Sequence, residues 1–115
     1  MAKRYLIWID DERPIPHHFY DTYNEENNFY ILRASNYKAA TGWLENIHTF
    51  TPDAEVIVCF DHDLGEEKTG YDIAKFIVEN KIKISAYDIQ SMNPIGRLNI
   101  SELLNHYGYK RIYIV

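Results

Sequence analysis

The sequence has little of the material that marks disulfide-linked or membrane-embedded proteins. Its single cysteine, Cys59, cannot form an internal disulfide, which predicts a reducing, cytoplasmic location. No apolar run approaches the length of a membrane-spanning helix. Only five apolar residues follow Lys3 and Arg4 before Asp10, so we expect no signal peptide and no membrane partner.

Basic residues are also few. The 12 lysines and arginines stand against 17 aspartates and glutamates, which gives a net charge of −5. Because binding to long DNA depends on neutralising many phosphates, this balance argues against such a partner. A small nucleotide, or an RNA end held through a metal, is compatible with it.

Apolar residues, by contrast, are abundant enough to build a core, at 46% of the chain. The length of 115 residues suits one compact domain, so we predict that residues 1–115 form a single domain. Five runs rich in β-branched and aromatic residues predict strands. These runs are Tyr5–Ile9, Phe29–Arg33, Glu55–Phe60, Ala86–Gln90 and Arg111–Val115.

Apolar residues at helical spacing separate the later strands and predict three helices. Their expected bounds are Ser35 or Asn36 to about His48, Thr69 onwards, and Pro94 to Gly108. The connection 14–28 holds two prolines and a polar cluster, so any helix there should be short or irregular. Strands that alternate with helices predict right-handed crossovers, and therefore an α/β fold with a parallel, doubly wound sheet.

Polar residues follow three of the predicted strands at the point where each strand ends. These segments are Asp10–Arg13, Asp61–Asp63 and Ser91–Pro94. Doubly wound sheets bind ligands beyond the carboxyl ends of their strands. We therefore expect the three segments to converge on one site.

Asp10, Asp11 and Asp61 are the candidate metal ligands. Carboxylates in one crevice repel one another, and a bound cation relieves that repulsion. Oxygen ligands in the absence of a cysteine cluster favour Mg²⁺ or Mn²⁺ over zinc. The alternative is that these residues are only polar exits from strands. Acidic residues at the ends of two buried strands favour the functional interpretation.

The remaining polar residues each have more than one interpretation. His62 is a general acid, a metal ligand or a structural histidine, and an extended backbone would turn it away from the two flanking aspartates. Ser91 and Asn93 cap the helix that begins at Pro94, contact an anion, or do both. Arg13 pairs with a neighbouring carboxylate or clamps a phosphate.

Together these motifs resemble the receiver domains of two-component response regulators. In receivers, a double acidic turn and a phospho-accepting aspartate hold Mg²⁺, and a serine or threonine after the fourth strand senses the phosphate. Asp10-Asp11, Asp61 and Ser91 match those motifs, and Gly70 resembles the glycine that opens the next crossover. The resemblance implies a five-stranded parallel sheet in the order 2-1-3-4-5.

The carboxyl-terminal segment differs from that of ordinary receivers. Receivers carry a lysine, commonly followed by proline, after the fifth strand. Here Lys110 precedes the predicted fifth strand and the sequence stops at Val115. We therefore expect the signalling relay and the long final helix of a receiver to be missing.

Four segments resemble a divergent group, the cyclic-phosphate processing receiver domains. They are Ile9–Pro14, Phe60–Gly65, Thr69–Asp72 and Ser91–Arg97. This resemblance implies a receiver fold whose pocket acts on a cyclic phosphate, either a 2′,3′-cyclic RNA end or a cyclic nucleotide. Such domains often have a histidine before the serine, whereas this chain has Gln90.

The leading hypothesis is a metal-dependent phosphoesterase, a hydrolase that would serve either RNA repair or a conflict between phage and host. Asp10, Asp11 and Asp61 would hold Mg²⁺ or Mn²⁺. Asp61, His62 and Asp63 would form the catalytic group, with His62 or Asp63 managing a proton.

Arg13, Ser91 and Asn93 would bind the phosphate oxygens of that substrate. Two alternatives stay open. One is a module that binds a nucleotide or a protein partner without cleaving it, which Gln90 and the missing receiver lysine favour. The other is a receiver that accepts a phosphoryl group on Asp61.

Overall fold

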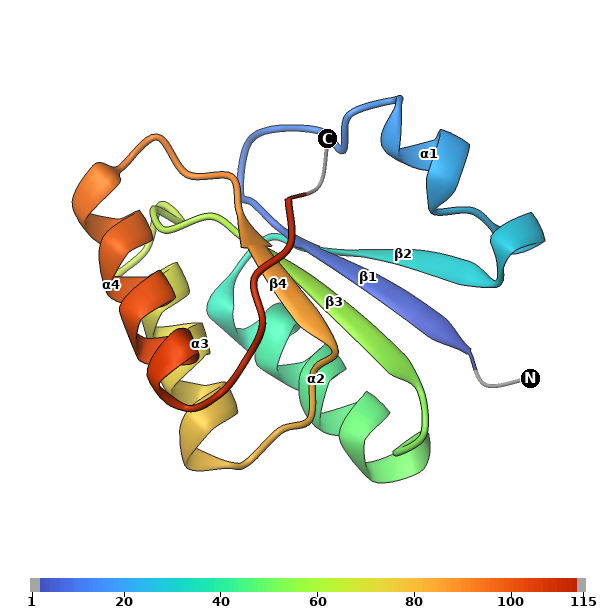
Figure 1. Cartoon of the computed structure of the whole chain (residues 1–115). Coiled ribbons are helices and arrows are strands. Elements are labelled where there is room, and N and C mark those ends of the chain that lie inside the picture. Colours follow the sequence, from blue (N-terminus) through green and yellow to red (C-terminus); the bar gives the residue numbers. More distant parts are fainter. Residues whose placement is uncertain (1–2, 114–115) are drawn as a thin grey trace.

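The computed structural model describes residues 3–113. Within these residues one sheet contains four parallel strands in the order β2-β1-β3-β4 (Figure 1). The strands are β1 (Arg4–Ile9), β2 (Phe29–Ala34), β3 (Glu55–Phe60) and β4 (Ala86–Ile89). The parallel α/β fold predicted from alternating strands and helices is therefore confirmed.

The strands end together at the carboxyl edge of the sheet. Ile9, the last residue of β1, pairs with Ala34, the last residue of β2. Phe60, at the end of β3, pairs with Ile89 at the end of β4. Because all four strands run in one direction, the residues that follow them emerge at the same edge.

Three helices pack against one face of the sheet (Figure 1). They are α2 (Tyr37–Phe50), α3 (Gly70–Glu79) and α4 (Pro94–His106), close to their predicted bounds. Fully buried side chains from strands and helices form the main core, including Ile7, Val58, Tyr87, Leu44, Ile73 and Leu104. Among residues 3–113, no helix is both long and apolar enough to cross a membrane.

The opposite face of the sheet is covered by a smaller cluster. The first connection contains only α1 (Phe19–Thr22) and a 3₁₀ turn (Glu25–Asn27), so the prediction of a short or irregular helix there is confirmed. Phe19 packs edge-on against Trp8, with 5.4 Å between the ring centres. The coverage of the two faces is therefore unequal.

The predicted fifth strand, Arg111–Val115, does not form within the described residues. Arg111 makes a single bridge to Tyr87 of β4, and the chain there runs parallel to β4. Two backbone hydrogen bonds hold it, from Tyr87 N–H to the Lys110 carbonyl and from Ile112 N–H to the Tyr87 carbonyl. The apolar run indicated a strand, but the ladder does not extend along the short β4. The last two residues of the predicted strand, 114 and 115, lie outside the described residues.

Candidate metal and phosphate site

The three long helices all begin at the carboxyl edge of the sheet, and polar residues fix their starts. Asn36 caps α2 and Asn93 caps α4, each accepting a hydrogen bond from a backbone N–H three residues ahead. At α3 the Asp72 carboxylate accepts the Thr69 N–H at 2.8 Å. Helix N-termini carry partial positive charge, so this edge is favourable to anions.

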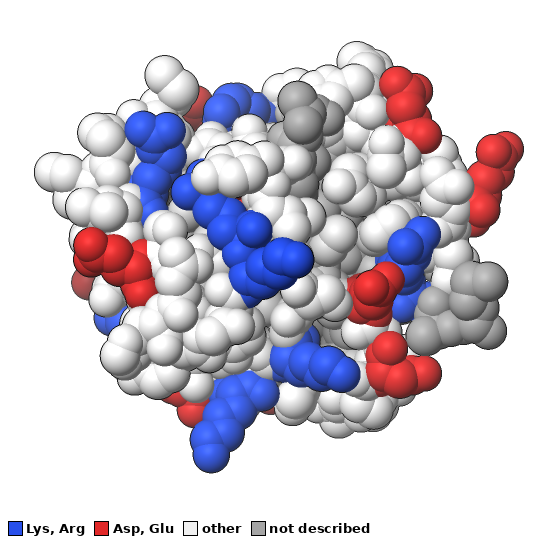
Figure 2. Space-filling model, viewed as in Figure 1, with Lys and Arg blue, Asp and Glu red and all other residues white. Residues whose placement is uncertain are grey.

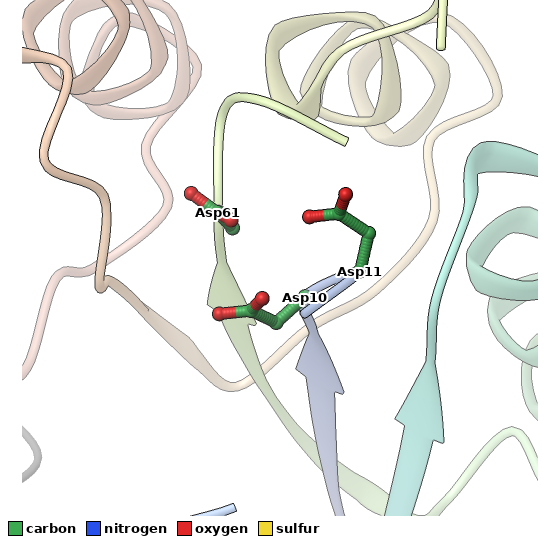
Figure 3. Close-up of side chains that lie close together, drawn as sticks. All are labelled: Asp10, Asp11 and Asp61. Carbon is green, nitrogen blue, oxygen red and sulfur yellow. The ribbon is translucent and has the colours of Figure 1, made fainter. Parts of the chain in front are cut away.

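The predicted carboxylates converge at this edge. Asp10, Asp11 and Asp61 each place an oxygen within 4.8 Å of the others. Figure 3 shows the three side chains around a common space at the ends of β1 and β3. Asp10 is 1% exposed and Asp61 is 9% exposed, so two of the three carboxylates are poorly hydrated. Their charge therefore calls for a neighbouring cation.

An acidic pocket of about 390 Å³ surrounds this cluster. Its lining residues are Asp10, Asp11, Glu12, Arg13, Asp61, Asp63, Gly65 and Met92. Three of these residues, Glu12, Gly65 and Met92, were not predicted as site residues from the sequence. Each lies within one of the four segments that resemble the cyclic-phosphate processing receiver domains, so its position beside the predicted site residues could have indicated it. Met92 is 88% exposed and forms an apolar rim.

A larger pocket, of about 510 Å³, lies at the opposite end of the sheet, between the α3–β4 connection and the residues after α4. Its charged lining residues are Lys81, Lys83 and Lys110. Figure 2 shows basic side chains over these parts of the surface. Cations near the ends of α3 and α4 compensate the negative carboxyl ends of the two helices. The acidic pocket is therefore the candidate site.

Asp10 organises the turn that follows β1. One carboxylate oxygen, Oδ1, accepts the backbone N–H groups of Glu12 and Arg13, each at 2.9 Å. The other oxygen, Oδ2, accepts Nε of Arg13 at 2.8 Å. The turn thus holds the Asp10 carboxylate in one orientation and directs the Arg13 side chain across the site.

Asp61 lines the acidic pocket, and its surroundings change the pKa of its carboxyl group. Burial raises the pKa of the Asp61 carboxyl above its usual value, and the Asp10 carboxylate raises it further. The Arg13 guanidinium, whose Nη2 lies 3.8 Å from Oδ1 of Asp61, lowers that pKa and offsets part of the rise. Such a carboxylate is stabilised in its charged form by any added cation.

The loop after β3 approaches Asp11 closely. Gly65 has a φ of +65°, a conformation that favours glycine. A Cβ atom at this position would lie 2.7 Å from Oδ2 of Asp11. The loop therefore closes one side of the acidic pocket only because a glycine stands there.

His62 points away from the pocket-lining set. Its ring packs against Gly96 of α4, where a Cβ atom would lie 2.3 Å from the ring. Nδ1 of His62 is buried and has no hydrogen-bond partner among the described residues. Asp63, by contrast, lines the pocket and is exposed. The opposite orientations expected along an extended backbone are therefore present.

Replacing Gly96 with alanine should destabilise the protein by about 2 kcal/mol, because the new methyl group overlaps the His62 ring. Urea unfolding of the single and double variants measures this effect. In a His62→Ala background the ring is gone, and Gly96→Ala should then cost little. An equal cost in both backgrounds would contradict the packing described here.

The loop after β4 carries the remaining predicted residues. Oγ of the buried Ser91 accepts the N–H of Asn93 at 3.1 Å. Nδ2 of Asn93 lies 3.5 Å from Oδ2 of Asp63, so the capping residue also reaches the rim of the acidic pocket. Gln90 turns its side chain to Asp88, with Nε2 donating to Oδ2 at 3.0 Å, while its carbonyl accepts Nη2 of Arg13.

The donor set fits a hard divalent cation. Three carboxylates from two strand ends supply oxygen ligands only, which suits Mg²⁺ or Mn²⁺. Because water reaches Asp10 and Asp61 poorly, a bound metal would provide most of the stabilisation of their negative charges. The acidic cluster could therefore hold a metal ion, as its sequence positions predicted.

A parallel sheet with an acidic pocket after β1 and β3 defines a receiver-like α/β domain. Residues 5–106 match the cyclic-phosphate processing receiver domain. The chain belongs to that family, so the resemblance found in its four motifs is confirmed. Comparisons with curated proteins and with solved structures found no significant match.

Proposed function

We propose that the protein is a metal-dependent phosphoesterase that opens a cyclic phosphate, either on a nucleotide or at a 2′,3′-cyclic RNA end. The observation that carries this proposal is the convergence of Asp10, Asp11 and Asp61 within a chain of the cyclic-phosphate processing receiver family. The reaction adds water to phosphorus and breaks one of the two ester P–O bonds, which leaves a phosphate monoester.

Asp10, Asp11 and Asp61 hold the metal in this proposal. Bound Mg²⁺ or Mn²⁺ would polarise a phosphoryl oxygen and acidify a water molecule. The protein orients Asp10 through the two backbone N–H groups that it accepts, so the ligand is placed before the metal arrives. Such preorganisation lowers the cost of binding and of catalysis.

Arg13, Ser91 and Asn93 face the substrate phosphate in the proposal. Arg13 supplies a planar donor group suited to phosphate oxygens. Asn93 stands at the N-terminus of α4, where the helix dipole attracts an anion. The apolar rim formed by Met92 can contact the organic part of the substrate.

Asp63 is better placed than His62 to transfer the proton. Asp63 lines the pocket, whereas the His62 ring lies against Gly96. The leaving alkoxide needs a proton, and a carboxyl at the rim can deliver it through water. His62 instead holds the β3–α3 loop against α4.

The direct test is turnover of 2′,3′- and 3′,5′-cyclic nucleotides and of an RNA oligonucleotide with a 2′,3′-cyclic end. With Mg²⁺ present, ³¹P NMR should show conversion of the cyclic phosphate to a monoester. Asp61→Asn should slow this conversion by about 100-fold, and chelation of the metal should stop it. No turnover of any substrate by folded protein, beside a working cyclic phosphodiesterase, would contradict the proposal.

Gln90 supports a second candidate function, a module that binds the same ligand without cleaving it. The residue stands where related domains often carry histidine, and its side chain is engaged with Asp88 on the far side of β4 from the helices. In that case a cyclic nucleotide with Mn²⁺ should raise the melting temperature while no product forms. Product formation would exclude this candidate.

A further inference from the structure

From the contacts of Arg13 we infer that its guanidinium is the built-in counter-ion of the metal-free acidic pocket, and that a divalent metal must displace it. This inference rests on the proposed metal site. The side chain contacts the residue that directly follows each of three strands: Asp10 after β1, Asp61 after β3 and Gln90 after β4. No other lysine or arginine forms an ion pair with Asp10, Asp11 or Asp61 in the described part of the chain.

The oxygen atoms of Asp10 make the competition specific. Oδ1 already accepts two backbone N–H groups, so Oδ2 is the oxygen with capacity for a metal. Oδ2 is also the atom that accepts Nε of Arg13 at 2.8 Å. A metal bound to Oδ2 and to Asp61 would therefore lie beside the guanidinium, and the two cations would repel each other.

Displacement of Arg13 is easy because its side chain is 45% exposed. The guanidinium is hydrated when it leaves, and the arriving metal replaces its charge beside the buried Asp10 carboxylate, which offsets part of the cost of breaking the ion pair. Asp10, at 2% side-chain exposure, cannot follow it and stays oriented by the turn. The carboxylates therefore remain in place while their cation is exchanged.

The exchange couples metal binding to anion binding. While Arg13 is held by Asp10, its Nε donor is occupied and cannot bind a phosphate. A metal that frees the guanidinium makes a bidentate donor available at the rim of the same pocket. By linkage, metal should raise the affinity for phosphate and phosphate should raise the affinity for metal by the same factor.

The test measures the dissociation constant of Mn²⁺ alone, by the electron paramagnetic resonance signal of the free ion. Arg13→Gln removes the competing cation and should bind Mn²⁺ about tenfold more tightly than the wild type. Arg13→Met is a second neutral variant in case the first fails to fold. Arg13→Lys keeps the charge and should stay within about threefold of the wild type.

Lys83→Gln provides the matched control, because it removes one positive charge from an exposed residue before β4, at the other end of the sheet. Its Mn²⁺ affinity should equal that of the wild type. A second titration with inorganic phosphate should show that Mn²⁺ raises phosphate affinity more in the wild type than in Arg13→Gln.

Unchanged or weaker Mn²⁺ binding by the folded neutral variants would overturn the exchange while leaving the metal site intact. A gain of equal size in Lys83→Gln would also overturn it, because net charge would then be the cause. If neither the wild type nor the neutral variants bind Mn²⁺, the metal site itself fails and the proposed phosphoesterase fails with it.

Discussion

Gly70→Ala is expected to destabilise the protein by about 3 kcal/mol and to lower its melting temperature by more than about 10 °C. A Cβ atom at Gly70 would lie 2.0 Å from the backbone oxygen of Asp61 and 3.1 Å from Cα of His62. Both neighbours are main-chain atoms, so no rotation of a side chain relieves the overlap. Either α3 or the end of β3 must shift, and Asp61 moves with it.

Urea unfolding compares this variant with Gly42→Ala, which serves as the matched control. Gly42 lies in the middle of α2, and a Cβ atom there would have no neighbour within 4 Å. Because alanine is a better helix former than glycine, the control should be about 0.5–1 kcal/mol more stable than the wild type. Equal and small effects at both positions would contradict the close contact of α3 with the end of β3.

Asp61→Asn is expected to stabilise the metal-free protein by about 1 kcal/mol at neutral pH while weakening Mn²⁺ binding by about 100-fold. In the folded state, burial and the Asp10 carboxylate raise the pKa of Asp61, so its charged form is costly. Asparagine has nearly the same shape and no charge. It removes that cost, and it is also a poorer ligand for a hard cation.

The extra stability of Asp61→Asn over the wild type should depend on pH in a known direction. Because the pKa of Asp61 is higher in the folded than in the unfolded chain, its stabilising contribution is complete at acid pH, where it is protonated. That contribution is lost as the pH rises through the folded-state value. The advantage of Asp61→Asn over the wild type should therefore be present at pH ~7 and absent at pH ~3.

Asp53→Asn makes the same chemical change at an exposed residue before β3 and should be neutral within about 0.5 kcal/mol. Calorimetric melting of the wild type and both variants across this pH range, without metal, gives the comparison. A wild type that is more stable than Asp61→Asn at neutral pH would show that the Arg13 contact outweighs burial and carboxylate repulsion.

The positions of the acidic residues could be predicted from the sequence because they depend on local patterns. Apolar runs predicted β1 and β3, and parallel strands bring the residues after their carboxyl ends to one edge of the sheet. Asp10 and Asp61 therefore had to be neighbours once the fold was known. The caps at Thr69 and Asn93 were likewise visible, because capping depends on residues within one helical turn.

Local sequence patterns do not predict contacts between segments that are distant in the chain. Arg13 donates a hydrogen bond to the carbonyl of Gln90, which is 77 positions away, and no local sequence pattern around Arg13 predicts that partner. The packing of His62 on Gly96 depends equally on the placement of α4. Within residues 111–113 the predicted fifth strand makes only one bridge to β4, since an apolar run becomes a strand only where a neighbouring edge pairs with it.

We propose above all that Asp10, Asp11 and Asp61 form a divalent metal site, and a crystal soaked in Mn²⁺ is the sharpest test. We expect an anomalous difference peak about 2.0–2.2 Å from oxygens of these three carboxylates, with Arg13 moved off Asp10. An Asp61→Asn crystal soaked in the same way should lack the peak. Well-ordered wild-type carboxylates with Arg13 still in place, and no anomalous peak among them, would contradict the claim.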